Sequence, residues 1–463
     1  MTWKDRLYRH CPVWAQNLAV TGFGAYWHWL RFGPGYREAV EAYEQQERYR
    51  SDEWTVWQRK RLKSLLRICA EEVPYYRDSW SEGEKRSAIQ GDLSGLPILG
   101  KEILRRDPWA VARRPKPGRG IHVFHTSGST GTPIASIWTT RELRNSLALR
   151  EVRSARWAGA SFSMPRATFS GRMVEPNPNS RGPFHRYNAV ERQCYLSAFH
   201  LSPATAQEYV RGLWECKTQW LTGYAVSYYL LAKLILEQRL EVPPLKAIVT
   251  TSEKATAEMR QVMERAFKCR VFEEYSTVEN AVFASECEMG RLHVSPDSGI
   301  VEILRPDGSA CVAGEVGEVV ATCLMRDFQP LVRFKLGDMA AWSGEICPCG
   351  REMPVLQEIV GRLEDVVVGP DGRQLVRFHG IFVDQPNIIE GQIIQEAANR
   401  IRAEVVGTEG FCAADVEDVR ARILQRLGAG VHVDVERVES IPRTSAGKFK
   451  AVVSLMNMRG DKR

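Results

Sequence analysis

The stretch from Leu245 to Glu279 constrains the fold more than any other part of the sequence. A short β-branched run, LKAIVTT, is followed by ATAEMRQVMERAF, whose apolar residues recur at helical spacing (Met259, Val262, Met263 and Ala266), and CRVFEEY is extended again. This order predicts a β-α-β unit with parallel strands and a right-handed crossover. The YSTVE segment after the second strand then lies at a carboxyl edge, where open α/β sheets bind ligands.

Composition excludes several classes of protein. With 463 residues, 44% of them hydrophobic and 26% charged, the chain is long enough for about three globular units. The net charge of +7 is small, and the basic residues are interleaved with acidic ones, which argues against nucleic acid as a partner and leaves anionic small molecules open. Eleven cysteines and the polar start MTWKDRLYRH predict a reducing, cytoplasmic location.

An aromatic segment near the start needs a separate interpretation. VWAQNLAVTGFGAYWHWL, residues 13–30, is the least charged early stretch, but Gln16, Asn17, Thr21 and His28 interrupt it. We therefore predict a packed or surface-lying aromatic segment and no transmembrane anchor.

The rest of the chain predicts two regions. WQRKRLKSLLRICAEEVP, from Trp57, has the period of one buried helix face and ends at Pro74. After Gly361 come a hairpin with Asp371-Gly372 at its turn, an extended run (GQIIQ), a polar helix (AADVEDVRARILQRL) and a last strand (VHVDVERV). We predict an α/β fold with a large multi-layer region of mixed and parallel sheets, residues 1–361, and a small mobile α+β domain, residues 362–463.

The loop HTSGSTGTP, residues 125–133, combines hydroxyls and glycines. Glycines let backbone N–H groups converge on an anion, and hydroxyls add rotatable donors, although solvated turns share this composition. A P-loop requires a Walker lysine and a helix directly after the loop. Here PIASIW follows as a strand, and only then does Thr139 start a helix through a capping box with Glu142. From the residues alone, a phosphate loop between two strands and an ordinary turn both remain open.

Together with four later stretches, this loop resembles the adenylate-forming superfamily of acyl-CoA synthetases, within it the phenylacetate-coenzyme A ligase branch and its capsular-polysaccharide-associated relatives. The stretches are TSGSTGTP (126–133), YSTVE (275–279), VRFKLGD (332–338), GRLED (361–365) and PRTSAGK (442–448). The resemblance implies that a carboxylate attacks the α-phosphate of ATP to form an acyl-adenylate and pyrophosphate, after which a thiol, expected to be that of coenzyme A, displaces AMP. An amine or a carrier-protein thiol remains an alternative acceptor.

The resemblance also implies roles for individual residues. The loop residues Thr126, Ser127, Gly128, Ser129, Thr130 and Gly131 would hold the β- and γ-phosphates, Tyr275 would stack on adenine, and Glu279 would bind Mg²⁺. The family pattern has glycine where this chain has Ser276 and a hydroxyl where it has Val278, so Thr277 is the candidate for the α-phosphate contact.

Two further groups follow from the same resemblance. Asp338 would accept both ribose hydroxyls, because a carboxylate offers two acceptor oxygens, and Lys448 would reach from the small domain to bridge ATP and the substrate carboxylate. The junction at Gly361-Arg362 corresponds to the hinge between domains. The family's hinge aspartate position is taken by Glu364, followed by Asp365, and either acid fits the role.

SECEMGRLHVS and EICPCGRE supply three thiols and an imidazole: Cys287, His293, Cys347 and Cys349. Three thiolates and one imidazole form a closed tetrahedral zinc set, which predicts a structural Zn²⁺ ion. The alternative is a group of buried free cysteines.

The middle of the chain is rich in aromatic residues, and we expect it to line a pocket for the carboxylic acid. His185, His200 and Tyr224 are the candidate pocket residues, and an aryl or arylacetic acid would suit such a lining. Two other classes stay open: a non-catalytic relative that binds nucleotide as a scaffold, and an unrelated zinc-stabilised binding protein. The sequence leaves the oligomeric state open.

Overall fold

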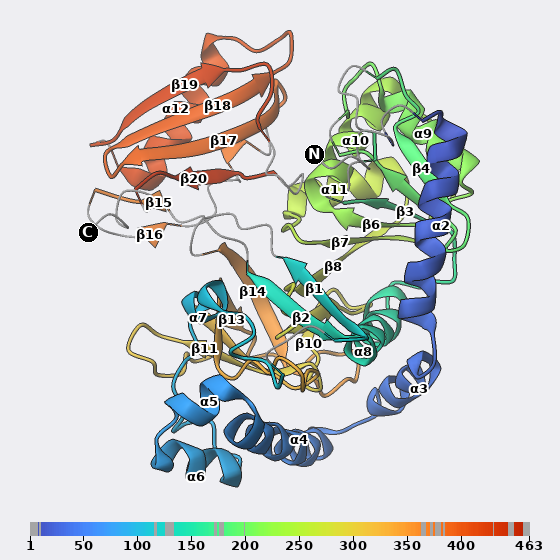
Figure 1. Cartoon of the computed structure of the whole chain (residues 1–463). Helices are drawn as coiled ribbons and strands as arrows, with labels where there is room; N and C mark the ends of the chain where they lie inside the picture. Colours follow the sequence, from blue (N-terminus) through green and yellow to red (C-terminus); the bar gives the residue numbers. More distant parts are fainter. Residues whose placement is uncertain are drawn as a thin grey trace.

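The structure is a computed structural model, shown in Figure 1. It describes residues 8, 11–114, 118–125, 134–170, 174–175, 180–198, 200–362, 367–370, 374–375, 381–382, 385–428, 430–442 and 449–456. The phosphate-loop candidates at 126–131, the hinge acids Glu364 and Asp365, and Lys448 lie outside these described residues.

The amino-terminal part is helical. Its described helices are α2 (Val13–Phe32), α3 (Tyr36–Gln46), α4 (Ser51–Glu72), α5 (Pro74–Ser79), α6 (Glu82–Gln90) and α7 (Lys101–Arg106). The periodic residues Leu62, Leu65, Leu66 and Cys69 are all buried in α4, so the predicted helix face is confirmed. Pro74 is the first residue of α5, a position where its missing N–H leaves no helical hydrogen bond unmade.

One mixed sheet holds the large region together. Its strand order is β11-β12-β13-β14-β10-β9-β8-β7-β6-β3-β5-β4. The run β5-β3-β6-β7-β8 is paired in parallel, whereas β4 pairs antiparallel with β5 and β9 pairs antiparallel with β8. The strands are β3 (Arg166–Phe169), β4 (His185–Asn188), β5 (Gln193–Leu196), β6 (Trp220–Tyr224), β7 (Ala247–Thr251), β8 (Arg270–Ser276), β9 (Phe283–Glu286), β10 (Leu292–Val294), β11 (Gly299–Leu304), β12 (Val316–Cys323), β13 (Phe334–Trp342) and β14 (Val355–Arg362).

Helices cover the parallel part of this sheet. The helices α9 (Ala206–Glu215), α10 (Ala225–Gln238) and α11 (Ala257–Phe267) share one hydrophobic cluster with β3, β5, β6, β7 and β8. The predicted β-α-β unit is β7-α11-β8, and β7 pairs with β8 in parallel, as predicted. The parallel strands β3, β5, β6, β7 and β8 therefore end at a common edge.

A separate hairpin carries the Ser/Gly-rich loop. Strand β1 (Ile121–His125) pairs antiparallel with β2 (Ala135–Thr139), which confirms that the loop connects two strands. The predicted capping box between Thr139 and Glu142 starts α8 (Thr140–Arg150), which continues into a π-helical turn, Glu151–Ala155.

The carboxyl-terminal region forms its own small sheet, drawn in orange and red in Figure 1. Its order is β19-β18-β17-β20, with β17 (Ile388–Ala397), β18 (Arg400–Gly407), β19 (His432–Arg437), β20 (Val452–Ser454) and the helix α12 (Ala413–Leu427); the hairpin strands β15 (Val367–Val368) and β16 (Gln374–Leu375) precede it. The prediction that VHVDVERV is the last strand is wrong, because the three-residue β20 follows and pairs in parallel with β17. The α/β fold with a second, smaller α+β region is confirmed.

Candidate active site

The carboxyl edge of the parallel strands brings several predicted residues to one side of the sheet. Tyr224 ends β6 and Ser276 ends β8, with β7 between them. Gly223, beside Tyr224, has φ +129°, and a Cβ there would lie 1.9 Å from the carbonyl oxygen of Phe169. Only glycine therefore permits the close approach of β6 to β3 that sets this edge.

A tight turn follows β8. The N–H of Asn280 donates to the carbonyl oxygen of Thr277 at 2.9 Å, and Asn280 has φ +51°, a left-handed conformation that asparagine tolerates. Within the turn, Val278 is exposed and Glu279 is buried.

Two polar groups of this turn have unused hydrogen-bonding capacity. Among the described residues, the buried Oγ1 of Thr277 has no hydrogen-bond partner. The described residues offer the Glu279 carboxylate no hydrogen bond and no ion pair, although it interacts electrostatically with the Arg326 guanidinium. Buried polar groups are normally hydrogen-bonded. Two buried polar groups in one turn that lack a hydrogen bond among the described residues are therefore the pattern expected where a ligand binds.

Tyr275 and Asp338 join two of the predicted motifs directly. The Tyr275 hydroxyl donates to Oδ2 of Asp338 at 2.7 Å, across 63 residues of sequence. Asp338 is buried in β13 directly after Gly337, whose φ of +75° turns the chain, and it pairs in register with Arg362 at the end of β14. The predicted adenine residue, ribose residue and junction residue therefore lie together.

The strand ends that flank the Ser/Gly-rich loop lie next to the same turn. His125 pairs with Ala135, so the loop leaves and re-enters the hairpin at one point. Directly after it, the Ser136 hydroxyl donates to the carbonyl oxygen of Val278 at 3.3 Å. The described ends of the loop thus connect the first motif to the second.

Arg326 fastens these segments, and sequence reasoning missed it. Its guanidinium is fully buried and donates to the carbonyl oxygen of Glu279 at 2.6 Å, to Oγ of Ser136 at 3.0 Å and to the carbonyl oxygen of Ile137. It stacks over the Trp138 ring with 4.3 Å between the guanidinium carbon and the ring centroid. Because Arg326 donates to acceptors on both segments, it holds β2 against the turn that contains Glu279.

The carboxyl-terminal region contacts the same edge through Glu253, just after β7. One carboxylate oxygen accepts from the Val226 N–H in the first turn of α10 at 3.0 Å, and the other accepts from the Phe449 N–H at 3.3 Å. Phe449 directly follows Lys448 in the sequence. A second contact runs from Nζ of Lys233 to the carbonyl oxygen of Ile388 at 3.0 Å.

The three candidate pocket residues lie in different surroundings. Tyr224 is buried at the end of β6, and the His200 ring stacks on Phe184 and contacts Oγ of Ser197 at 2.8 Å through Nδ1. His185, on the edge strand β4, lies 3.4 Å from a carboxylate oxygen of Glu215 on α9, and burial lowers its pKa. The structure gives His185 a partner on the covering helix, and the pocket roles of all three stay predictions.

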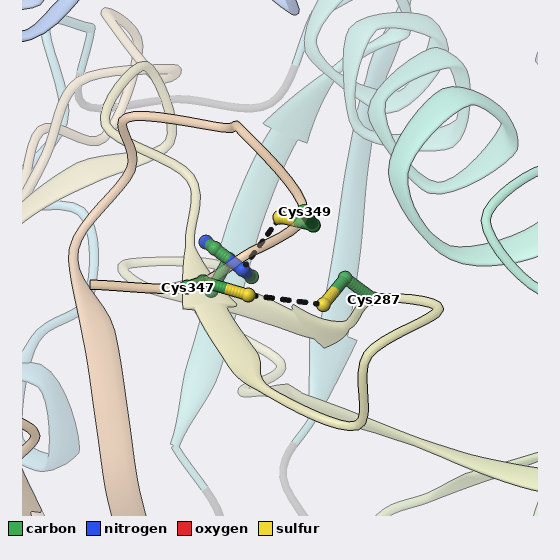
Figure 2. A group of neighbouring side chains, drawn as sticks. Cys287, Cys347 and Cys349 are labelled. Atoms are coloured by element: carbon green, nitrogen blue, oxygen red, sulfur yellow. Dashed lines mark hydrogen bonds between the residues drawn. The ribbon is translucent and has the colours of Figure 1, made fainter. Parts of the chain in front are cut away.

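The four predicted metal ligands come together (Figure 2). The ligand atoms of Cys287, His293, Cys347 and Cys349 all lie within 4.8 Å of one another, and Figure 2 labels the three cysteines. Sγ of Cys287 is 3.7 Å from Sγ of Cys347, and Sγ of Cys349 is 3.4 Å from Nε2 of His293. A tetrahedral zinc ion with ordinary bond lengths has S–S edges of about 3.8 Å and S–N edges of about 3.6 Å.

Neighbouring groups orient this cluster. Nδ1 of His293 contacts the Met353 carbonyl oxygen at 3.3 Å, which leaves Nε2 for the cluster, and the Trp157 ring meets the imidazole edge-on. Burial lowers the pKa of His293 to about 4 and raises the pKa of the Cys347 thiol to about 12. The imidazole is therefore neutral at pH 7, the form that binds a metal.

Comparison with known proteins adds relatives to this geometry. Residues 369–455 match the family model described as the CapK C-terminal domain. The chain is 23% identical to Protein CapK of Staphylococcus aureus over 97% of this chain and 98% of that protein, and 23% identical to a phenylacetate-coenzyme A ligase of Thermus thermophilus over 86% and 96%. The chain is a homologue of CapK and of phenylacetate-coenzyme A ligases.

A solved structure has the same fold as this chain. 2-Hydroxyisobutyryl-CoA ligase in the postadenylation state, in complex with R3-HIB-AMP, matches with a TM-score of 0.69 at 21% identity, over 90% of this chain and 92% of the ligase. In its thioesterification state the same ligase matches with a TM-score of 0.54. The chain therefore has the same fold as this acyl-CoA ligase.

Proposed function

We propose that the chain is an ATP-dependent, AMP-forming carboxylate ligase that activates a carboxylic acid as its acyl-adenylate and then transfers the acyl group to a thiol. The observation that carries the proposal is the 2.7 Å hydrogen bond from Tyr275 to Asp338, because it joins two motifs at the edge where Thr277 and Glu279 also lie. The relatives that are named as coenzyme A ligases support the same reaction class.

In this proposal the Tyr275 and Asp338 pair recognises the nucleoside. A carboxylate has about four lone-pair sites, so Asp338 accepts from Tyr275 and keeps capacity for ribose hydroxyls. The same hydrogen bond fixes the Tyr275 ring, which then offers a face for adenine stacking.

Thr277 and Glu279 serve the phosphates. The buried Oγ1 of Thr277 has no partner in the described structure and supplies a donor for the α-phosphate. Glu279 provides a hard carboxylate ligand for Mg²⁺, which would neutralise phosphate charge when bound with ATP. The loop from Thr126 to Gly131 adds backbone and hydroxyl donors for the β- and γ-phosphates.

In the proposed reaction the protein aligns the substrate carboxylate with the α-phosphate and forms no covalent bond to either. An oxygen of the substrate carboxylate bonds to the α-phosphorus, the bond to the bridging oxygen breaks, and pyrophosphate leaves with the electron pair. Lys448 holds the two repelling anions together, and the Glu253 contact to the Phe449 amide anchors the segment beside it. A thiolate then attacks the acyl carbon, and AMP leaves.

Substrate and acceptor follow from the same resemblance. Coenzyme A is the proposed thiol, because the relatives are named as coenzyme A ligases. We propose an aryl or arylacetic acid as the carboxylate, in a pocket to which Tyr224 and His200 contribute. The hinge would lie at Arg362, the last residue of β14, with Glu364 or Asp365 as its acid. The boundary between the regions at 361/362 belongs to the same proposal.

The test is carboxylate-dependent exchange of labelled pyrophosphate into ATP with Mg²⁺ and without thiol, across aryl, arylacetic, fatty and amino acids. We expect exchange with one class of acid, a loss of about 100-fold or more in Lys448→Ala, and unchanged exchange in Lys246→Ala, which removes an exposed lysine. Wild-type exchange in Lys448→Ala would overturn the adenylation assignment. Nucleotide binding without exchange for any acid would favour a scaffold.

We also propose a structural Zn²⁺ ion in the cluster of Cys287, His293, Cys347 and Cys349. The support is geometric, because two measured edges of the cluster match those of a zinc tetrahedron. The set leaves no open coordination position, so the ion would hold β9 and β10 to the loop before β14 and take no part in the reaction. Metal analysis of the purified chain should find one zinc ion, and Cys347→Ser should lose it while Cys412→Ser, at an exposed thiol, keeps it.

A further inference from the structure

Helix α2 lies along the outer margin of the molecule beside β4, the last strand of the large sheet (Figure 1). Its polar side chains take the place of the missing neighbouring strand. Oδ1 of Asn17 accepts from the Tyr187 N–H at 3.0 Å, and Oγ1 of Thr21 donates to the Tyr187 carbonyl oxygen at 3.3 Å. The helix thereby covers a sheet edge whose unpaired backbone groups would otherwise favour aggregation.

The buried residues of α2 are Gln16, Gly24 and, near its carboxyl end, Leu30. The buried Gln16 accepts a hydrogen bond from Arg186 at 2.5 Å. A Cβ at Gly24 would lie 2.3 Å from the Asn188 side chain, so the helix approaches β4 too closely for any larger residue. A surface helix normally buries its apolar face, whereas α2 faces β4 mainly with polar or small residues and buries one large apolar side chain, Leu30.

The outward face consequently exposes large apolar side chains. Trp14, Leu18, Phe23, Tyr26 and Trp29 are 53–67% exposed. The other exposed residues of α2 are Ala19, Gly22 and Ala25, so the outward face carries no charged side chain. Single exposed apolar residues are ordinary, but a continuous aromatic face on one helix marks an interaction surface.

The net charge of the sequence segment that contains α2 indicates what this face binds. Helix α2 contains no acidic residue, and residues 1–37 hold five lysines and arginines (Lys4, Arg6, Arg9, Arg31 and Arg37) against one aspartate, a net charge of +4 out of +7 for the whole chain. Tryptophan and tyrosine favour the headgroup level of bilayers, and clustered basic residues favour anionic lipids. In the part of the chain that the structure describes, no helix has the length and apolar composition to cross a bilayer.

We propose that α2 docks the chain on the surface of an anionic lipid bilayer, with the helix lying in the plane of the headgroups and Trp14, Leu18, Phe23, Tyr26 and Trp29 turned toward the lipid. A second copy of the chain fits the charge less well, because apposed α2 helices would bring two basic segments together. This inference is independent of the proposed ligase activity.

Co-sedimentation of the full chain with lipid vesicles tests the proposal. We expect binding to vesicles of phosphatidylcholine mixed with phosphatidylglycerol, and roughly tenfold weaker binding to phosphatidylcholine alone. Trp14→Ser/Trp29→Ser should lower the partition coefficient on anionic vesicles by about tenfold or more, since two large interfacial side chains are lost. The control Val56→Ser removes an apolar side chain that is 66% exposed on α4 and should bind like wild type.

Two results would overturn the proposal. One is wild-type protein that stays in the supernatant with anionic vesicles. The other is a wild-type dimer, detected by light scattering, that Trp14→Ser/Trp29→Ser converts to a monomer while vesicle binding is unchanged, because α2 would then face a second copy. If the double variant unfolds, Leu18→Gln repeats the test with a smaller change, and an unaltered partition coefficient in that variant also counts against lipid docking.

Discussion

Strand β14 connects two polar clusters that differ in how completely their atoms are paired. At its first residue, Val355 packs with Cys287 and Cys347 in the cysteine-histidine cluster. At its last residue, Arg362 lies in register with Asp338, close to the turn in which Thr277 Oγ1 has no hydrogen-bond partner among the described residues. We call the first cluster closed, because its ligand atoms lie next to one another. We call the second cluster open, because it keeps hydrogen-bond donors and acceptors that a bound ligand could use.

The two clusters should differ in what a substitution changes: the free energy of unfolding or the proposed reaction. Closed polar clusters hold segments together, and changes in them should alter the free energy of unfolding. Open clusters keep unsatisfied groups that weaken the folded state and are retained for a ligand. Substitutions at the two ends of β14 should therefore affect different measurements.

The largest expected effect is at the closed end. Cys287→Ser should lower the free energy of unfolding by on the order of 5 kcal/mol, because the zinc tetrahedron loses a thiolate and the segments it joins come apart. Urea denaturation with parallel metal analysis measures both consequences, with Cys412→Ser as the control. Unchanged stability together with one retained zinc ion would show that the cluster is only a group of buried thiols.

Arg326 is an exception to this division between stability and catalysis. Its buried guanidinium belongs to the open cluster, but its expected effect is on stability, because it holds the Glu279 turn in place. Arg326→Met should destabilise the chain by about 3 kcal/mol, since the carbonyl oxygens of Glu279 and Ile137 lose their donor inside the protein. Urea denaturation is the measurement, and Arg77→Met, at an exposed arginine, is the control. Wild-type stability in Arg326→Met would mean that the turn holds its position without this clamp.

Sequence reasoning singled out the residues of both clusters but missed the groups that hold the open cluster in place. Tyr275, Asp338 and the four metal ligands belong to short motifs whose chemistry is visible locally. Arg326 is not visible in this way, because its partners are backbone carbonyls 47 and 189 residues away. Glu253 likewise appears in the sequence as an ordinary loop acid, and only the fold brings it to Phe449.

The aromatic segment shows a second limit of pattern reading. Its interrupting polar residues argued against a spanning helix, and no helix in the described part of the chain is long and apolar enough to cross a bilayer. The sequence could not show which face of the helix would be buried. Asn17 and Thr21 turn inward because β4 is an edge strand with unpaired backbone groups. That role depends on the strand order of a sheet whose pairings span the chain.

At the open end, a change of ligand contact should alter the reaction and leave stability nearly constant. Asp338→Asn should lower kcat/KM for ATP in pyrophosphate exchange by about 10- to 100-fold, because a charged acceptor for the ribose hydroxyls becomes neutral. Asp307→Asn, in an exposed turn, should leave exchange unchanged. The contrary outcome is that Asp338→Asn destabilises the chain while its folded fraction exchanges pyrophosphate at the wild-type rate. Asp338 would then stabilise the fold and would not contribute to ATP binding.

The smallest expected effect lies between the two clusters, at Glu273 on β8. Burial raises the pKa of Glu273 to about 7, against the lowering effect of Arg260 and Lys254. The folded state therefore binds this proton more tightly than the unfolded state, so the stabilisation is fully present below about pH 4.5 and is lost as the pH rises through 7.

Glu273→Gln should remove this pH dependence. Because the side chain is 20% exposed, we expect wild type to lose on the order of 1–2 kcal/mol relative to the variant between pH 5 and pH 8. Thermal unfolding of both proteins across this range measures the difference, and Glu258→Gln, at an exposed position on α11, should keep the wild-type dependence. If the stability of wild type and of Glu273→Gln changed with pH in the same way, the pKa of Glu273 would be near its ordinary value and this prediction would be wrong.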